Sequence, residues 1–361
     1  MKQALIVILC LWSGLILGQS PLDAILPERE RAKVIDEILE ERIEELLPQL
    51  MDREGLDMWI LISREYNEDP VMKTMLPSTW LSARRRTIMV YNRSEQGIDK
   101  IAIARYSVGR LLKGEWNVDV YPNQWEALAN VIEAKDPKTI GLNYSTSFAL
   151  ADGLVKTEYE EFLDHIPHGY RDRIVSAERL AVAWLETRSQ KEIELYKQLC
   201  AMGHEILQEA FSADVITAGE TTSDDVIWWL RNRVTELGLE TWFHPSVSIQ
   251  RSEMDKNEFL RSFSKRKEDD VIQKGDLLHV DFGITYLRLN TDQQQHFYML
   301  RDDETEVPKG LKEAFKNGNM LQDILVSQYQ TGKSGNQILR DALAEAKEKG
   351  IRGSIYTHPI G

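Results

Sequence analysis

Residues 275–300, GDLLHVDFGITYLRLNTDQQQHFYML, form a strand-like segment that carries two aspartates eleven residues apart. Val, Ile, Phe, Tyr and Leu dominate this segment, and a carboxylate buried among them is costly unless something pairs with it. In one continuous strand, the odd spacing would place Asp281 and Asp292 on opposite faces. We therefore predict that the segment folds as an antiparallel hairpin, which brings both aspartates to the same face.

A hairpin turn near Tyr286–Leu287 would place the two aspartates directly opposite each other, with Cβ atoms ~5 Å apart. Two ionised carboxylates at that separation repel each other unless one is protonated or a cation lies between them. Hard divalent ions prefer carboxylate oxygens, and two carboxylates can bridge a pair of ions ~3.5–4 Å apart. The spacing indicates a metal site, with surface acids on neighbouring strands as the alternative. The turn is weakly signalled, because YLRL contains no Gly or Asn-Gly.

Asp281-Phe282-Gly283 also matches the D-F-G signature of protein kinases. A kinase requires, in addition, an upstream H-R-D catalytic loop and a glycine-rich loop over the phosphates. The sequence contains neither motif. The kinase interpretation is therefore rejected.

A third candidate ligand is His358, in THPIG, which follows the strand-like stretch IRGSIYT. The combination of D-x-G, an aspartate eleven residues later and H-x-x-G resembles the pita-bread (M24-type) metallopeptidases. This family includes methionine aminopeptidases, aminopeptidase P, prolidase and creatinase. The resemblance implies that Asp281, Asp292 and His358 bind metal, and that two later glutamates complete a site for two divalent ions. It implies Mn²⁺, with Co²⁺ or Zn²⁺ as alternatives.

The sequence ends at Gly361, before any counterpart of those two glutamates. We therefore expect a catalytic domain that is truncated at its C-terminus. The two glutamates are expected beyond Gly361 in a longer parent protein. With too few ligands to hold two metals tightly, the 361-residue chain is expected to be inactive or to bind metal weakly.

Strand-like runs alternate with helical patterns ahead of the hairpin, at MWILIS (58–63), RTIMVYN (86–92), DKIAIARY (99–106) and KTIGLNY (138–144). This alternation predicts an α/β domain, which we assign to residues 28–185. The helical stretch 176–211 breaks near Thr187–Ser189, and a second domain follows over residues 186–361. Aminopeptidase P, prolidase and creatinase carry an extra N-terminal α/β domain. The resemblance thus implies a creatinase-like N-terminal domain followed by an incomplete α+β pita-bread catalytic domain.

The function implied by the resemblance is that of a metal-dependent aminopeptidase that hydrolyses Xaa-Pro bonds. Within this family, the sequence resembles secreted bacterial Xaa-Pro aminopeptidases. Two ions would activate water and polarise the scissile carbonyl. The substrates would be peptides with proline at the second position. A non-catalytic pita-bread binding protein and a creatinase-like C–N hydrolase stay open as alternatives, and so does a homodimer.

Two features depart from the family pattern. The second aspartate is usually followed by x-T-R, whereas this chain has Gln293–Gln295. The family also places a substrate-binding histidine seventeen or eighteen residues before the first aspartate, where this chain has Ser264 or Phe263. The nearest upstream histidine is His244, in TWFHPSVSIQ. We consider it a candidate for substrate binding or proton relay, with a packed loop histidine as the alternative.

Two further histidines follow the same alternation as the aspartates. His279 alternates with Asp281, and His296 lies four residues after Asp292, so each should share the face of its neighbouring acid. Either could support the site by hydrogen bonding to a ligand. A histidine satisfied within the core is the alternative for His279.

The chain is acidic overall, and its N-terminal segment is apolar. The 361 residues carry a formal charge of −14, from 58 acids and 44 bases, and this acidity argues against nucleic-acid binding. Residues 1–20, MKQALIVILCLWSGLILGQS, resemble a signal peptide, with Lys2 before an apolar core. We expect export to the periplasm or the extracellular space. An uncleaved anchor is the alternative, although the apolar run is short for a ~20-residue span.

Overall fold

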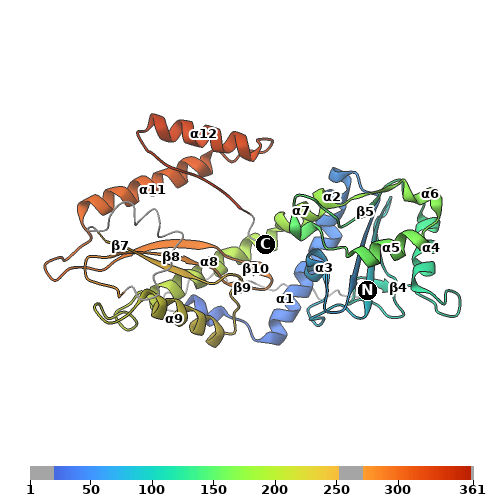
Figure 1. Ribbon diagram of the computed structural model, residues 1–361, viewed down its shortest axis with the longest axis horizontal. Helices are drawn as coiled ribbons and strands as arrows, with labels where there is room; N and C mark the ends of the chain where they lie inside the picture. Colours follow the sequence, from blue (N-terminus) through green and yellow to red (C-terminus); the bar gives the residue numbers. More distant parts are fainter. Residues whose placement is uncertain (1–19, 252–270, 359–361) are drawn as a thin grey trace, which may run out of the picture.

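The computed structural model describes residues 20–251 and 271–358. The predicted signal peptide, except for Ser20, and the positions Phe263 and Ser264 lie outside the described residues. Within the described ranges, no helix is both long enough and apolar enough to cross a membrane. Two groups of helices and strands lie side by side (Figure 1). We describe them as the first and the second unit.

The first unit is built on a six-stranded sheet with the order β4-β3-β2-β1-β5-β6. The strands are β1 (Met58–Arg64), β2 (Arg86–Ser94), β3 (Gly97–Ala102), β4 (Lys113–Gly114), β5 (Ile140–Leu142) and β6 (Ile174–Ser176). Its helices are α1 (Glu28–Glu41), η2 (Arg42–Leu46), α2 (Leu47–Glu54), α3 (Pro70–Met75), α4 (Gln124–Lys135), η3 (Ala149–Ala151), α5 (Lys156–His165), α6 (His168–Arg171) and α7 (Glu178–Glu186). A short helix, η1 (Pro21–Ala24), precedes them.

Both faces of this sheet are buried, which makes the unit a three-layer α/β sandwich. Successive residues of a strand point to opposite faces, so Trp59 packs with α2, α3 and α7, whereas Ile60 packs with α4 and α5. Burial on both sides explains why β1 and β2 read as continuous apolar runs. Gly55 ends α2, because it caps the helix in the left-handed conformation.

The second unit combines helices with a small antiparallel sheet, β11-β8-β7. Its elements are α8 (Gln190–Ala210), α9 (Ser223–Glu236), β7 (Ser246–Gln250), β8 (Leu277–Phe282), β9 (Thr285–Tyr286), β10 (Leu289–Asn290), β11 (Gln293–Tyr298), α11 (Lys309–Ser327) and α12 (Gly335–Glu348). Helices α7 and α8 break at Thr187–Ser189, as predicted, because Ser189 and Glu192 form a capping box that starts α8. Thr222 caps α9 in the same way.

The apolar face of the small sheet packs on α8 and α9. Leu278, Val280 and Phe282 of β8 point into a core that also contains Met202 of α8 and Leu230 of α9. The opposite face of the sheet carries the polar residues of the three strands. Residues 351–357, which the sequence predicts as a strand, have no regular secondary structure, so His358 follows an irregular segment.

Helix α1 contributes to both cores. Val34 and Ile35, in its N-terminal half, pack against the core of the second unit, whereas Leu39 belongs to the core of the first. A hydrophobic pattern at helical spacing shows which residues are buried, but it does not show which core receives them. The predicted boundary at residues 185–186 falls just before the Thr187–Ser189 break, and α1 crosses the seam between the two units.

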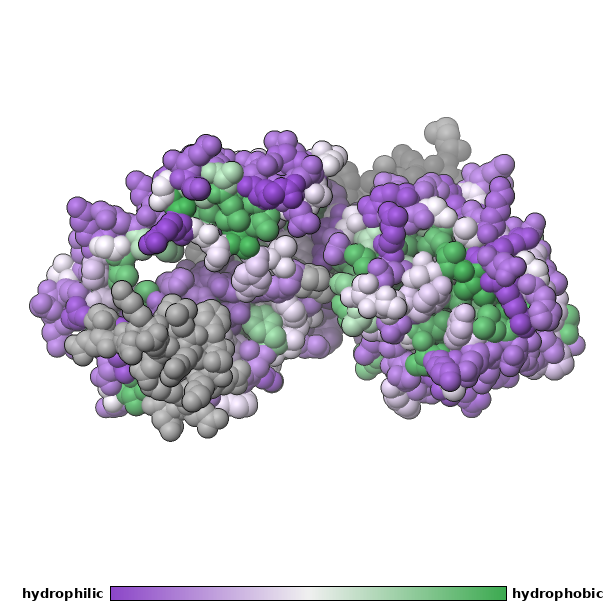
Figure 2. All heavy atoms as spheres, turned by 45° about the horizontal axis from the view of Figure 1, so that its top comes forward, coloured by the Kyte–Doolittle hydropathy of each residue, from purple (hydrophilic) through white to green (hydrophobic). Residues whose placement is uncertain are grey.

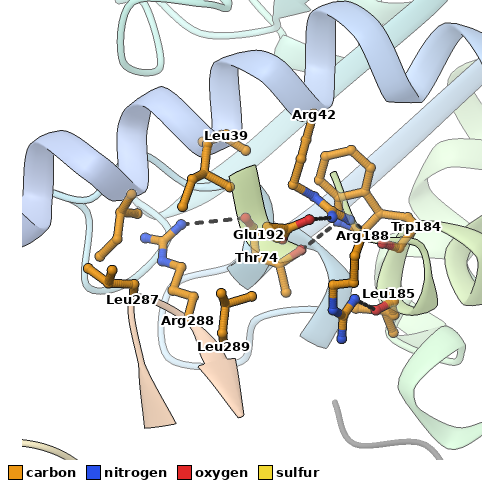
Figure 3. Close-up of a pocket in the computed structure, with 12 residues that line it drawn as sticks. Leu39, Arg42, Thr74, Trp184, Leu185, Arg188, Glu192, Leu287, Arg288 and Leu289 are labelled. Atoms are coloured by element: carbon orange, nitrogen blue, oxygen red, sulfur yellow. Dashed lines mark hydrogen bonds and ion pairs between the residues drawn. The ribbon is translucent and has the colours of Figure 1, made fainter. Parts of the chain in front are cut away.

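A buried ion pair connects the two units where they meet. Arg42 and Glu192 are both buried, and the Arg42 Nη1 donates to the Glu192 carboxylate at 2.6 Å and to the Thr187 carbonyl at 2.8 Å. The guanidinium also lies over the Trp184 ring at 4.3 Å. Burial lowers the pKa of Arg42, and the charge of Glu192 offsets part of that effect. The pair joins α1 and η2 to the start of α8 (Figure 3).

Candidate metal centre

The hairpin predicted around the two aspartates is present, but its register differs from the prediction. Asp281 pairs with Gln294 across β8 and β11, and Tyr286 pairs with Leu289 across β9 and β10. The two turn residues are therefore Leu287 and Arg288, and not Tyr286 and Leu287. Asp281 and Asp292 lie diagonally across the ribbon instead of directly opposite each other, and both project from the same face.

The three predicted ligands meet on this polar face. The Nε2 of His358 lies 3.4 Å from the Oδ2 of Asp292. Burial raises the pKa of Asp281. The negative charge of nearby Asp292, and a hydrogen bond with it, raise that pKa further. His279 and His358 act in the opposite direction. The Oδ1 of Asp281 is buried and has no hydrogen-bond partner.

This arrangement matches the chemistry of a divalent cation. Two carboxylates and an imidazole are donors that such ions accept, and a buried carboxylate oxygen without a partner is costly until a cation or a proton reaches it. Among residues 20–251 and 271–358, no group of three His, Cys, Asp or Glu side chains is arranged so that it could hold a metal ion by itself. Asp281, Asp292 and His358 supply suitable donor atoms, but in this arrangement they do not form a complete metal site.

The neighbouring histidines occupy the same polar face, as predicted. His279 pairs with His296 across the two strands, and their rings lie 4.9 Å apart. His279 shares a hydrogen bond with Gln294 (Nε2 to Oε1, 3.1 Å), and Gln294 is the cross-strand partner of Asp281. Burial, followed by the charge of His279, lowers the pKa of His296. The face thus carries a row of imidazoles beside the acids.

His244 lies on the loop that precedes β7. Its Nδ1 is 3.1 Å from the Nη1 of Arg231, and its ring centroid lies 5.6 Å from that of Trp228 in an edge-to-face arrangement. Both partners belong to α9. Ser246, two residues after His244, pairs with Asp281, which puts the histidine at the end of the strand next to the ligand strand. Its role in substrate binding or proton relay stays a prediction.

Gln293–Gln295, which stand where the family has x-T-R, are all engaged in contacts. Gln293 points toward α8, where its Nε2 donates to the carbonyl of Cys200 at 3.1 Å. Gly203 leaves room for this side chain, because a Cβ there would lie 1.8 Å from the Gln293 Oε1. Gln295 hydrogen-bonds with His204 of the same helix. Two of the three glutamines therefore hold β11 against α8, just beyond Asp292.

The glycine of the D-x-G motif has a steric role that its spacing alone does not reveal. A Cβ on Gly283 would lie 2.2 Å from the carbonyl oxygen of Thr291 and 2.6 Å from the rings of Trp242 and Phe243. The Trp242 Nε1 also donates to that same carbonyl at 2.7 Å. Thr291 immediately precedes Asp292, so this close contact between the hairpin strands helps to set the position of the second aspartate.

Replacing Gly283 with alanine should destabilise the chain by about 1–3 kcal/mol, because the new methyl group overlaps a backbone atom that cannot move away freely. A methyl group added to Gly318, in α11, would meet no heavy atom within 4 Å, and Gly318→Ala should instead stabilise by up to about 1 kcal/mol. Urea unfolding of the two variants would test the contrast. Equal effects would show that the hairpin has room at Gly283.

Part of the sequence matches a known protein family. The sequence profile of metallopeptidase family M24 matches residues 194–361, which include all three candidate ligands. Residues 194–361 belong to metallopeptidase family M24. This M24 segment contains the whole hairpin and the face on which Asp281, Asp292 and His358 meet. A comparison with curated proteins gives no match.

Solved structures share the pita-bread fold of the M24 family with this chain. An X-Pro aminopeptidase from Thermotoga maritima MSB8 matches with a TM-score of 0.58 at 17% identity, over 84% of this chain and 78% of that one. An Xaa-Pro dipeptidase from Bacillus anthracis gives 0.51 at 16%, over 88% and 78%. A variant of Escherichia coli aminopeptidase P gives 0.58 at 10%, over 88% and 75%. At these identities the likeness establishes the fold, and the chain spans about three quarters of each protein.

Sequence reasoning missed the structural roles of three residues near the site: Gly283, Thr291 and Arg288. The D-x-G motif names the glycine without its steric reason. Thr291 resembles an ordinary strand residue, although its buried Oγ1 accepts a hydrogen bond from the Ile284 amide at 3.1 Å. Arg288 lies in a turn with no sequence signal, and only its tertiary contacts reveal its importance.

Proposed function

We propose that this protein is a metal-dependent aminopeptidase that hydrolyses the bond between an N-terminal residue and proline. One observation carries the proposal: the buried, unpartnered Oδ1 of Asp281 lies on the hairpin face where Asp292 and His358 also meet. Membership of residues 194–361 in the M24 family supports the peptidase class. The similar solved structures include aminopeptidases and dipeptidases named for Xaa-Pro substrates, and this supports the proline preference.

The three residues would divide the work of holding two divalent ions, with Mn²⁺ as our first choice and Co²⁺ or Zn²⁺ as alternatives. Asp281, Asp292 and His358 would each contribute donor atoms to these ions. When bound, such ions polarise a scissile carbonyl and activate water. Gln294 and His279 would keep the Asp281 strand in place through their mutual hydrogen bond. Further ligands from outside these three residues are required.

A peptidase assay on the protein in its full natural length tests the proposal. A tripeptide with proline at the second position should be cleaved after its first residue, and a matched tripeptide with alanine there should be cleaved far more slowly. Prior treatment with a chelator should abolish both reactions, and Mn²⁺ should restore them. Cleavage that is unaffected by the chelator would contradict the proposal.

The same assay separates the two rival functions. Hydrolysis of creatine without cleavage of either peptide would indicate a creatinase-like C–N hydrolase. Peptide binding without any hydrolysis would indicate a pita-bread binding protein. The use of Gln293 and Gln295 to fasten β11 to α8 favours this second rival over the first, because those positions depart from the family pattern next to a ligand.

Export is a separate proposal that rests on residues 1–20 alone. Cleavage after this segment would remove Lys2 and the apolar run while retaining every residue of the candidate site. Mass spectrometry of the natural protein, isolated from its host, would show the mature N-terminus. A protein that retains Met1 and remains in the cytoplasmic fraction would contradict export.

A further inference from the structure

The tip of the ligand hairpin adopts a backbone that its residues do not favour. The two-residue loop between β9 and β10 consists of Leu287 and Arg288, with φ angles of +53° and +64°. Two positive φ angles in a two-residue hairpin loop indicate a type I′ turn, which usually takes Asn-Gly or Asp-Gly. A side chain with a Cβ makes this left-handed conformation unfavourable. Contacts outside the hairpin must therefore hold the turn in place.

Those contacts come from the first unit. The guanidinium of Arg288 donates to the carbonyl of Leu76 at 2.6 Å, and to the carbonyls of Thr74 and Pro77 at 3.4 Å each. These carbonyls lie at and just beyond the C-terminal end of α3, where they have no partner within the helix and carry partial negative charge. Figure 3 shows Arg288 reaching across the seam toward Thr74.

Apolar residues flank the tip, although Arg288 itself is partly open to solvent. Leu287 and Leu289, on either side of Arg288, are buried, and they line a small cavity at the seam together with Leu39 of α1 (Figure 3). Burial lowers the pKa of Arg288, and the charge of Asp36 partly offsets this effect. Asp36 in turn accepts a hydrogen bond from the Ser78 amide at 2.7 Å, so α1 steadies the loop to which Arg288 binds.

A continuous hydrogen-bonded ribbon connects the tip to the candidate ligands. Tyr286 pairs with Leu289. The Thr291 amide donates to the Ile284 carbonyl at 2.9 Å. Asp281 pairs with Gln294 in the same register. Only three residues separate Arg288 from Asp292. A shift of the tip would therefore also shift both aspartates, because the paired strands between them are short.

We propose that Arg288 is a positioning residue, through which the first unit fixes the tip of the hairpin that carries Asp281 and Asp292. In this proposal the first unit has a role in the site, because its carbonyl groups bind Arg288 and so hold the metal-ligand hairpin in register. The consequence for metal binding rests on the proposed function, whereas the anchoring of the tip does not.

Hydrogen exchange of the metal-free chain tests the anchoring. In Arg288→Ala, amides of residues 285–294 and of residues 74–78 should exchange at least ~10-fold faster than in the wild type, because hydrogen bonds from a charged donor are lost at a strained turn. Arg288→Lys should recover part of the protection, since a lysine keeps the charge and a donor. Arg340→Ala, on the exposed face of α12, is the matched control and should leave both segments unchanged.

A double variant separates anchoring from turn preference. Leu287→Asn with Arg288→Gly supplies the residues that a type I′ turn favours, but it removes the guanidinium. Protection of residues 285–290 should then be retained, while residues 74–78 still lose it. If the double variant restores protection in both segments, or if Arg288→Ala changes neither, the anchor does not exist.

Mn²⁺ titration tests the consequence for the ligands. Affinity should fall about 10-fold in Arg288→Ala, in the range expected when a residue that supports metal ligands is lost, and Arg288→Lys should restore part of it. Faster exchange with unchanged affinity would overturn the positioning role. If the wild type binds no Mn²⁺, the proposed function fails, and hydrogen exchange still decides whether Arg288 anchors the hairpin.

Discussion

Replacing Asp281 with asparagine is expected to lower metal-dependent peptidase activity of the natural-length protein at least ~100-fold. Loss of a residue that merely supports a ligand typically costs 10–100-fold in affinity or activity, and loss of a ligand should cost more. Asparagine keeps the size of the side chain and removes the charge that would face the ion. Steady-state cleavage of a peptide with proline at the second position, together with the metal content of the purified protein, would measure the effect.

The same substitution should not weaken the metal-free fold. Without an ion, Asp281 is a partly buried carboxyl beside Asp292, and its Oδ1 has no partner. Removing one of two neighbouring charges relieves repulsion, so thermal unfolding of metal-free Asp281→Asn should occur at or above the wild-type midpoint. Asp302→Asn, at an exposed acid, is the control for both measurements. Full activity in Asp281→Asn would contradict its assignment as a ligand.

Replacing Glu192 with alanine should destabilise the chain by about 3–5 kcal/mol, the range for a buried ion pair that loses one partner. Arg42 would keep its charge in the interior without the carboxylate that lies 2.6 Å from it. The Ser189 amide at the start of α8 would also lose its hydrogen bond to Glu192, which now measures 2.7 Å. Urea unfolding followed by tryptophan fluorescence would measure the change, because Trp184 lies against Arg42.

Glu194→Ala provides the matched control two residues further along α8, at an exposed position. It should change stability by no more than about 0.5 kcal/mol. Glu192→Gln should fall between the two variants, because glutamine can keep the hydrogen bond at the helix start but not the charge. A cost below about 1 kcal/mol for Glu192→Ala would show that the ion pair does not fasten the seam between the units.

Hydrophilic residues cover most of the face drawn in Figure 2, and apolar patches interrupt them on both units. Exposed large apolar residues on the second unit include Phe315, Val326 and Tyr329, all on or next to α11. Scattered apolar side chains on a surface are ordinary. They carry no argument for a homodimer, which stays a prediction.

Much of the fold follows from local signals in the sequence. Gly55 stops α2, Ser189 starts α8 and Thr222 starts α9, and each acts through backbone chemistry confined to one helix turn. The alternation of apolar residues in β8 likewise sets which face is buried, and it correctly places Asp281 and His279 together on the other face. Such features depend on neighbours in the chain, so one sequence is enough to find them.

The register of the hairpin could not be predicted in this way. Leu287 and Arg288 are unusual residues for a type I′ turn, and Arg288 donates hydrogen bonds to three carbonyls among residues 74–77, more than two hundred positions earlier. A long-range contact leaves no periodic signal in the sequence. The predicted turn was therefore shifted by one residue, and the pairing of Asp281 moved from Asp292 to Gln294.

In the candidate site, too, local patterns in the sequence identified some residues, whereas long-range contacts left no signal. The spacing of Asp281 and Asp292 and the H-x-x-G motif pointed to three residues that do meet on one face. The steric need for glycine at position 283, the contacts of Gln293–Gln295 with α8 and the role of Arg288 are tertiary. Each depends on atoms from an element distant in the sequence, and none could be inferred from spacing alone.

Mn²⁺ titration of the chain and of its ligand variants tests the central claim most directly. The wild type should bind Mn²⁺, even if weakly, and Asp292→Asn and His358→Ala should each lower the affinity at least ~10-fold. The double variant should bind little worse than the weaker single variant, because residues that hold a common ion are not additive. Mn²⁺ affinity equal to that of the wild type in both single variants would contradict a metal centre at this hairpin.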